Sequence, residues 1–173
     1  TDAVIQTGAG PLSVTLHEDG RVSALMGVPI VGARALTLEP AVDGVTQSAT
    51  RVSMGNPHAV FFVPDVDAVP LADVGPRVET HPLFPHHTNV EFVQALAPDR
   101  LRVRVWERGA GATQACGTGA CAAHVAARLH GLATERATLA LPGGLLDLEW
   151  PGEGHQVKLT GPAVHVFDGT WPL

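Results

Sequence analysis

The stretch WERGAGATQACGTGAC, residues 106–121, sets a thiol in a turn of small residues that opens directly into an alanine-rich segment. A cysteine at a helix N-terminus lies against unpaired backbone N–H groups and the positive end of the helix dipole, which favours the thiolate. Glycines beside the thiol let a substrate approach the main chain closely, as an anion held by N–H groups requires. The turn therefore predicts both a base, Cys116, and an anion cradle.

The segment after this turn predicts a helix over residues 117–130 that ends at Gly131, where glycine can adopt a left-handed cap. Its first three turns are almost entirely Ala, Gly, Cys and Val. Side chains this small favour close packing inside a curled sheet over a position at the surface. Cys121 lies in an apolar stripe with Val125 and Leu129, which predicts a buried structural cysteine.

The rest of the chain is rich in short alternating or apolar runs that predict strands, with a β-meander at the start. One further short helix is predicted at 71–78, before a proline-broken loop at 80–85. The expected fold class is α+β, with a curled mixed or antiparallel sheet wrapped around a central helix. The predicted strands cover residues 3–6, 12–17, 21–26, 47–54, 59–63, 89–94, 101–106, 138–141, 145–150, 156–160 and 163–167.

Composition limits the classes of partner. The chain has 173 residues, 45% of them hydrophobic, and a formal net charge of -6. This charge argues against a nucleic acid or an anionic membrane as partner, since both require clustered Lys and Arg. No apolar run approaches the roughly 18 residues of a membrane span, and the N-terminus lacks the layout of a signal peptide. A soluble cytoplasmic protein is expected.

The two cysteines are too few for a disulfide framework. His86 and His87 are adjacent, but no other ligand lies at the spacing of a zinc site, so no metal is expected. A cysteine hydrolase is disfavoured because no third residue is evident that would orient His58 as the base.

Five motifs, in order and at matching spacing over nearly the whole chain, together resemble the diaminopimelate epimerase family. The resemblance implies a cofactor-independent isomerase that interconverts LL- and meso-diaminopimelate on the way to lysine and peptidoglycan. In this family one cysteine removes the α-proton and a second returns it from the opposite face, without pyridoxal phosphate. The motifs are residues 54–58 (MGNPH), Asn89-Val90, residues 106–111 (WERGAG) with residues 115–123 (ACGTGACAA), residues 141–144 (LPGG) and residues 160–163 (TGPA).

The resemblance also implies roles for individual residues. Cys116 corresponds to one catalytic thiol, and the backbone of Gly117 and Thr118 to part of the carboxylate cradle. His58 and Glu107 correspond to residues that accept or hand on protons beside the thiols. The contacts to the distal amino-acid end of the substrate are assigned to Asn56, Asn89 and Arg108, with Glu107 counted among the substrate-binding residues.

Two departures from the family pattern stand out. Ala112 replaces an acidic residue that many relatives carry, and no cysteine precedes Cys116, so the partner thiol is missing from this chain. The resemblance therefore predicts a C-terminal portion of an epimerase, inactive alone, that lacks an N-terminal segment and is a homodimer when full length. Residues 1–15 and 162–173 would be strands of the absent N-terminal domain, and residues 16–161 the C-terminal domain. Such strands would leave unpaired edges.

Two alternatives remain open. One is a related proline or hydroxyproline racemase or a phenazine-type isomerase. The other is a non-catalytic carboxylate-binding module, in which replacing Cys116 would leave ligand affinity nearly unchanged.

Overall fold

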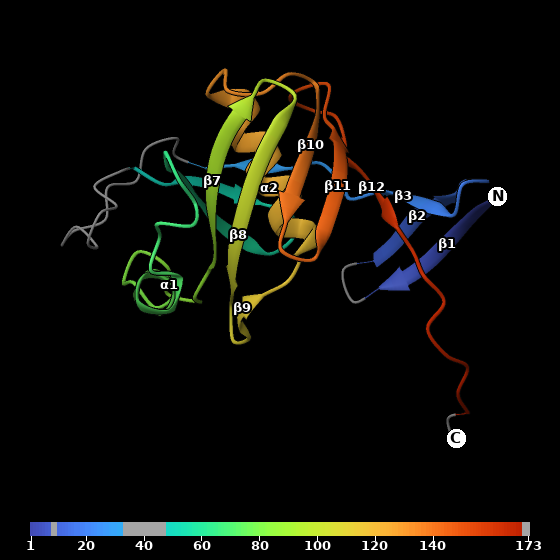
Figure 1. Cartoon of the computed structure of the whole chain (residues 1–173), viewed down its shortest axis with the longest axis horizontal. Coiled ribbons are helices and arrows are strands. Elements are labelled where there is room, and N and C mark those ends of the chain that lie inside the picture. The colour runs from blue at the N-terminus through green and yellow to red at the C-terminus, as the bar shows by residue number, and fades with distance from the viewer. Residues whose placement is uncertain (8–9, 33–47, 171–173) are drawn as a thin grey trace.

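The computed structural model describes residues 1–7, 10–32 and 48–170. Within these residues twelve strands form one mixed sheet, and the helices α1 (Leu71–Glu79) and α2 (Gly117–Leu129) pack on it (Figure 1). The strands are β1 (Asp2–Thr7), β2 (Gly10–Leu16), β3 (Arg21–Leu25), β4 (Ile30–Val31), β5 (Thr50–Ser53), β6 (Pro57–Phe62), β7 (Asn89–Ala97), β8 (Arg100–Glu107), β9 (Gly111–Thr113), β10 (Arg136–Leu141), β11 (Gly144–Glu149) and β12 (Lys158–Pro162).

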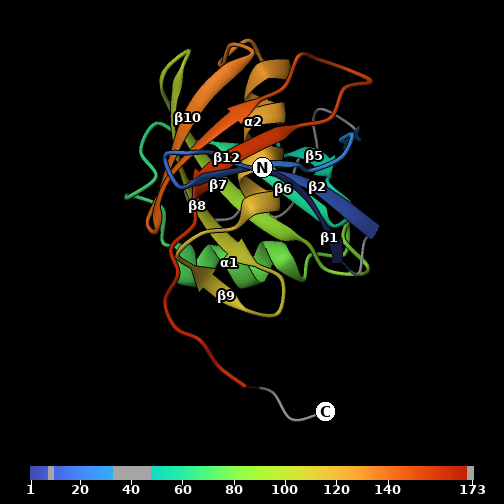
Figure 2. The same ribbon diagram turned by 90° about the vertical axis from the view of Figure 1, so that its right-hand side faces the viewer.

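The strand order across the sheet is β1-β2-β3-β12-β11-β10-β8-β7-β6-β5-β4, with β9 paired to β8. The pairs β6/β7 and β8/β10 are parallel, and the other pairs are antiparallel. The sheet is neither closed nor strongly curled, which corrects the prediction of a sheet wrapped around a helix. The reason is that β1, β2 and β3 extend away from the body at one end, the end that faces the viewer in Figure 2, and so do not wrap around α2 (Figure 1).

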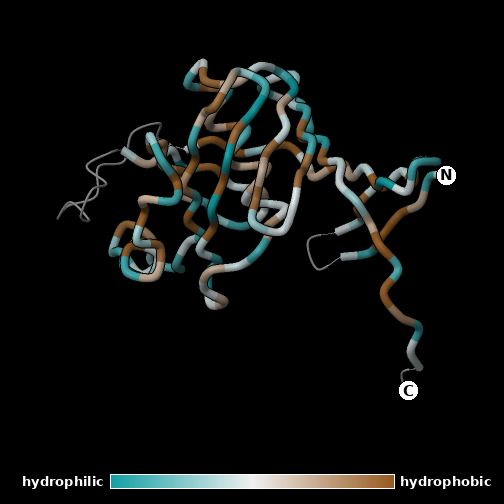
Figure 3. The backbone as a smooth tube through the Cα atoms, viewed as in Figure 1, coloured by the Kyte–Doolittle hydropathy of each residue, from teal (hydrophilic) through white to brown (hydrophobic). Residues whose placement is uncertain are grey.

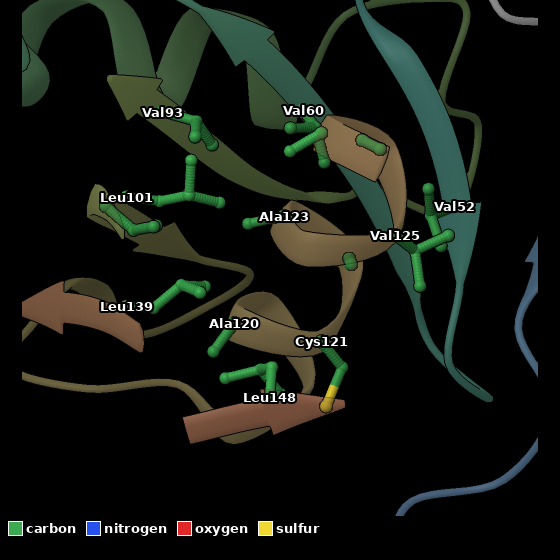
Figure 4. Packing of buried hydrophobic residues seen from close by; sticks show 14 of the residues in the cluster. Val52, Val60, Val93, Leu101, Ala120, Cys121, Ala123, Val125, Leu139 and Leu148 are labelled. Atoms are coloured by element: carbon green, nitrogen blue, oxygen red, sulfur yellow. The ribbon is translucent and has the colours of Figure 1, made fainter. Parts of the chain in front are cut away.

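Helix α2 is the centre of the main core. It contacts β5, β6, β7, β8, β10 and β11, and every residue from Gly119 to Ala127 is buried. Apolar side chains of the surrounding strands close on it, among them Val60, Leu101 and Leu148 (Figure 4). Because strands approach the helix from several sides, only small side chains fit on it, and the predicted close packing is confirmed.

Helix α1 covers the opposite face of the central strands. It contacts β7, β8 and β9, and its Val74 and Val78 pack with Phe61 and Phe92 in a second core cluster. Side chains alternate between the two faces of a strand, so β6, β7 and β8 each contribute to both clusters. The central strands of the sheet are therefore buried on both faces.

Most predicted elements are confirmed, with shifted ends. The 71–78 helix ends one residue later, and Gly131 takes the left-handed conformation (φ +70°) that the predicted cap requires. The strand predicted at 47–54 is confirmed as β5, and the first position of that range lies outside the described residues. Two short strands, β4 and β9, were not predicted.

The strand predicted at 163–167 is wrong. β12 ends at Pro162, and the residues that follow pair with no neighbour in the part of the chain that the structure describes. The tail instead runs clear of the body and contains hydrophobic residues (Figure 3). The side chains of these residues are exposed, with Phe167 at 79%. A strand requires a hydrogen-bonding neighbour, and the sheet offers none beyond Pro162.

Strand β1 forms the open edge at the same end of the sheet. All six of its residues are exposed, including Val4 and Ile5. An apolar edge strand with one uncovered side is a surface that another chain or segment can cover. Neither helix in the described part is long and apolar enough to cross a membrane.

Candidate active site

The sequence-predicted residues meet at one edge of the central sheet. The parallel strands β6 and β7 both begin there, with His58 in register with Asn89. β8 is antiparallel to β7 and ends at this edge with Glu107, while α2 begins there after Cys116. Strand direction alone therefore brings together residues that lie up to sixty positions apart in the sequence.

Cys116 caps helix α2. Its backbone is extended (φ -134°, ψ 111°), and its Sγ accepts a hydrogen bond from the Gly119 N–H at 3.3 Å. The Thr118 hydroxyl lies 3.5 Å from the same sulfur. The side chain is buried, but its nearest polar neighbours are hydrogen-bond donors, so the sulfur is not sealed in apolar packing.

The predicted thiolate is wrong for the protein without ligand. Burial raises the pKa of the Cys116 thiol to about 11, against the lowering effects of the hydrogen bonds from Thr118 and Gly119. The carboxyls of Glu91 and Glu107 raise it further by repulsion. At this site the cost of burying a charged sulfur outweighs the stabilisation that the helix N-terminus and the two hydrogen bonds give to the thiolate. A pKa raised in this way favours the neutral thiol at neutral pH.

A chain of side chains runs from Cys116 into the protein. Thr118 accepts a hydrogen bond from Asn56 Nδ2 at 3.2 Å, and Asn56 Oδ1 lies 3.0 Å from His58 Nε2. His58 is buried, and its Nδ1 lies 2.7 Å from Glu91 Oε1. The structure thus joins Asn56, Thr118 and His58 to the thiol, and both polar ends of the Asn56 amide are already engaged.

Glu91 was missed by the sequence analysis. Its carboxyl is fully buried, and a methyl group on Gly119 would lie 2.8 Å from its Oε1 and 3.2 Å from Cys116 Sγ. Glycine is therefore needed where α2 passes between the carboxyl and the sulfur. The sequence did contain a signal for this buried carboxyl, because Glu91 is a charged residue flanked by Val90 and Phe92 in an otherwise apolar strand.

Glu107, Asn89 and Arg108 lie at the rim of the same edge. Glu107 Oε1 accepts a 2.6 Å hydrogen bond from the Thr113 hydroxyl on β9. Asn89 donates to the Pro57 carbonyl and accepts from the Arg108 backbone N–H, so it ties β6 to the turn after β8. The Arg108 side chain is exposed and donates to the His86 carbonyl at 3.1 Å.

Glu79, at the end of α1, holds the turn that follows β8 in place. Its carboxylate accepts hydrogen bonds from Trp106 Nε1 at 2.7 Å and from the Gly109 N–H at 2.9 Å. Burial alone would raise the pKa of Glu79, but the hydrogen bonds from Trp106, Gly109 and His87 outweigh it, so the pKa is lowered. The conformation of the Glu107-Arg108 turn therefore depends on an ionised Glu79.

We expect Glu79→Gln to destabilise the fold by about 1–2 kcal/mol at pH 7, because a buried charge-assisted hydrogen bond is lost. A lowered folded pKa contributes stability above the unfolded value of 4.5, and this contribution is lost as pH falls through the folded pKa. Urea unfolding should show a gap between wild type and variant at pH 7 that narrows below pH 4. Asp73→Asn, an exposed acid on the same helix, is the control. An equal gap at both pH values would contradict this role.

Cys121 and a cavity between β3, β10, β11 and β12 both lie outside this site. Cys121 is completely buried in the α2 core, and burial raises its pKa strongly. A cavity of about 550 Å³ is lined by residues of β3, β10, β11 and β12 and touches none of the residues above. A smaller cavity of about 200 Å³ borders His58, beside Arg51 and Phe84. The described residues contain no group of three or more His, Cys, Asp or Glu side chains placed to hold a metal ion.

The chain is similar in sequence to several known proteins. The family model described as diaminopimelate epimerase matches residues 50–166. A diaminopimelate epimerase of Synechococcus elongatus is 50% identical over 98% of this chain, and one of Moorella thermoacetica is 53% identical over 98%. The chain spans 64% and 66% of the length of these two relatives.

Solved structures with the same fold are more distant in sequence. A hydroxyproline epimerase from Agrobacterium vitis superposes with a TM-score of 0.71 at 16% identity, over 94% of this chain and 57% of that one. A putative phenazine biosynthesis protein from Clostridium difficile gives a TM-score of 0.64 at 14% identity, over 100% of this chain and 66% of that one. These likenesses establish the fold.

Proposed function

Because the chain belongs to the diaminopimelate epimerase family, isomerases of lysine biosynthesis, we propose that it carries one half of a two-thiol site that inverts the α-carbon of diaminopimelate. Cys116 exchanges a proton with one face of that carbon. The observation that carries this proposal is the placement of Cys116 at the start of α2, with two donors on its sulfur and two carboxyls beside it.

The start of α2 supplies the anion cradle. The first N–H groups of a helix have no partner within it and point along the axis at the positive end of the dipole. In α2 these groups belong to Gly117 and Thr118, which are partly exposed beside the thiol. A substrate carboxylate held there would place its α-carbon next to Sγ. Negative charge that develops as the proton leaves would be stabilised by the same groups.

We carry the remaining roles over from the resemblance to the family. His58 and Glu107 hand protons to and from the site, and Asn56, Asn89, Glu107 and Arg108 contact the substrate. Arg108 supports recognition of the distal end, because its guanidinium is exposed and a bidentate grip on a carboxylate is available to it. Asn56 and Asn89 are held by internal hydrogen bonds, which fixes their orientation before a ligand arrives.

The second thiol comes from outside this chain in our proposal. Cys121 is unsuitable because the core encloses it. We assign the partner thiol to a preceding segment of the whole protein, which would also cover residues 1–15 and 162–173 and leave residues 16–161 as the C-terminal domain. The exposed apolar residues of β1 and of the tail, such as Ile5 and Phe167, support such a cover. The whole protein is proposed to be a dimer.

A substrate panel tests the alternatives. Proline, hydroxyproline and phenazine-type substrates lack the second amino-acid end that Arg108 is assigned to bind. The sequence relatives reported above are diaminopimelate epimerases at about 50% identity, whereas the hydroxyproline epimerase shares 16%. A binding module without turnover would hold diaminopimelate and exchange no proton.

The test is proton exchange at the α-carbon. The chain is joined to the upstream segment of the Synechococcus elongatus relative and incubated with LL-diaminopimelate in deuterium oxide. We expect deuterium at one α-carbon, detected by mass spectrometry, together with formation of the meso isomer. Proline and hydroxyproline serve as control substrates and should remain unlabelled. A folded protein that labels none of these substrates would refute the epimerase proposal.

A further inference from the structure

Hydrogen-bond directions in the buried chain can be assigned from its atoms. Asn56 Oδ1 can only accept, so His58 Nε2, 3.0 Å away, must carry a proton. Asn56 Nδ2 then donates to the Thr118 oxygen at 3.2 Å. The proton of the Thr118 hydroxyl has Cys116 Sγ as its one acceptor among the described side chains. In this arrangement the hydrogen bonds run from His58 toward the sulfur.

The same logic fixes the protons between His58 and Glu91. With Nε2 protonated, the 2.7 Å contact between Nδ1 and Oε1 needs a second proton, on one atom or the other. The pair therefore holds two protons and is neutral overall. Glu91 Oε2 is buried and receives no hydrogen bond from the described residues, and burial raises the pKa of Glu91. An unpaired oxygen costs less on a neutral acid than on a carboxylate, which favours the two-proton state.

When the pair of His58 and Glu91 loses one proton, the hydrogen bonds of the whole chain reverse their direction. Glu91 becomes a carboxylate that accepts from His58 Nδ1–H, and His58 Nε2 becomes an acceptor. The Asn56 amide then has to turn, so that Nδ2 donates to Nε2 and Oδ1 accepts from Thr118. The Thr118 oxygen is left to accept from the Cys116 S–H. In the first direction the Thr118 hydroxyl donates a hydrogen bond to the sulfur, which favours the thiolate. In the reversed direction the Thr118 oxygen accepts a hydrogen bond from the S–H group, which favours the thiol.

We propose that Glu91 is a positioning residue: the proton that it shares with His58 sets the direction of the Glu91-His58-Asn56-Thr118 chain, and with it whether Cys116 receives or donates a hydrogen bond. This inference rests on the proposed acid–base role of Cys116. Other charged or titratable groups face these atoms, namely Glu107 from β8 toward both Cys116 and Glu91, and Cys121 from α2 toward Cys116.

The first measurement reads the proton on His58 directly. In the 173-residue chain with nitrogen-15 labelled histidine, the His58 signals are assigned by their loss in His58→Asn. We expect Nε2 to show the shift of a protonated nitrogen at neutral pH. An unprotonated Nε2 would overturn the proposal. This readout does not depend on turnover, so it stands apart from the test of the epimerase activity.

The second measurement is the pH midpoint of Cys116 alkylation by iodoacetamide, with the modified peptide identified by mass spectrometry. Glu91→Gln keeps a donor toward His58 Nδ1 that cannot ionise, so the chain stays in the direction that donates to the sulfur. The midpoint should therefore fall by about one pH unit, since roughly a tenfold gain in thiolate accompanies each unit. If Glu91 acts through the chain, most of this fall should vanish in a Thr118→Val background and persist in Thr118→Ser, which keeps the hydroxyl. An equal fall in both backgrounds would mean a through-space charge effect and would refute the chain.

Discussion

Replacing Cys116 by alanine is expected to lower the rate of α-proton exchange by about 10²- to 10⁴-fold, the range that a positioned acid or base contributes. The thiol is the group at the start of α2 that both receives hydrogen bonds and titrates. Cys116→Ser should be nearly as slow, since the hydroxyl fits the position but ionises far less readily. The rates are measured by deuterium incorporation in the chain joined to its upstream segment.

Cys121→Ala provides the matched control for this prediction. It removes the other thiol of the chain, from a completely buried position in the same helix. We expect exchange to persist while the free energy of unfolding falls by about 1–2 kcal/mol through the cavity left in the core. If Cys116→Ala exchanged protons as fast as Cys121→Ala, the assignment of the base would be wrong.

Acid is expected to destabilise the fold through His124, with a loss of about 2.5 kcal/mol between pH 7 and pH 4.5. His124 lies on α2 with no exposed surface, and burial lowers its pKa from 6.5 to about 4. Its Nε2 contacts the Glu135 carbonyl at 3.1 Å, and its Nδ1 is buried without a partner in the described part. His124 binds a proton below about pH 6.5 in the unfolded chain but only below about pH 4 in the folded chain. The free energy of unfolding therefore falls as the pH drops from 6.5 to 4.

Urea unfolding at a series of pH values tests this directly. His124→Gln keeps a donor for the Glu135 carbonyl but cannot titrate, so its stability should change less between pH 7 and pH 4.5 than that of the wild type. His124→Leu fills the site without polar atoms and should show the same flattening. The quantity compared is the slope of the free energy of unfolding against pH. An overall loss of stability in either variant therefore does not obscure the result. Parallel slopes in all three proteins would exclude His124 as the source.

The sequence by itself determined most of the elements and the family. Glycine at 131 and the run of small residues after Cys116 predicted where α2 begins and ends and that it would be buried, because both depend on local geometry and side-chain size. The motifs around Asn56, Asn89 and Cys116 identified the family, which the comparisons confirm.

Only the tertiary structure decided the protonation of the site. The helix N-terminus predicted a thiolate, but the pKa of Cys116 is raised, because burial and the approach of Glu91 and Glu107 outweigh the local donors. Glu91 reaches the site from a separate strand, since the parallel register of β6 and β7 places it beside His58. Desolvation and contacts between strands depend on what packs from elsewhere in the chain, and no local pattern of residues encodes them.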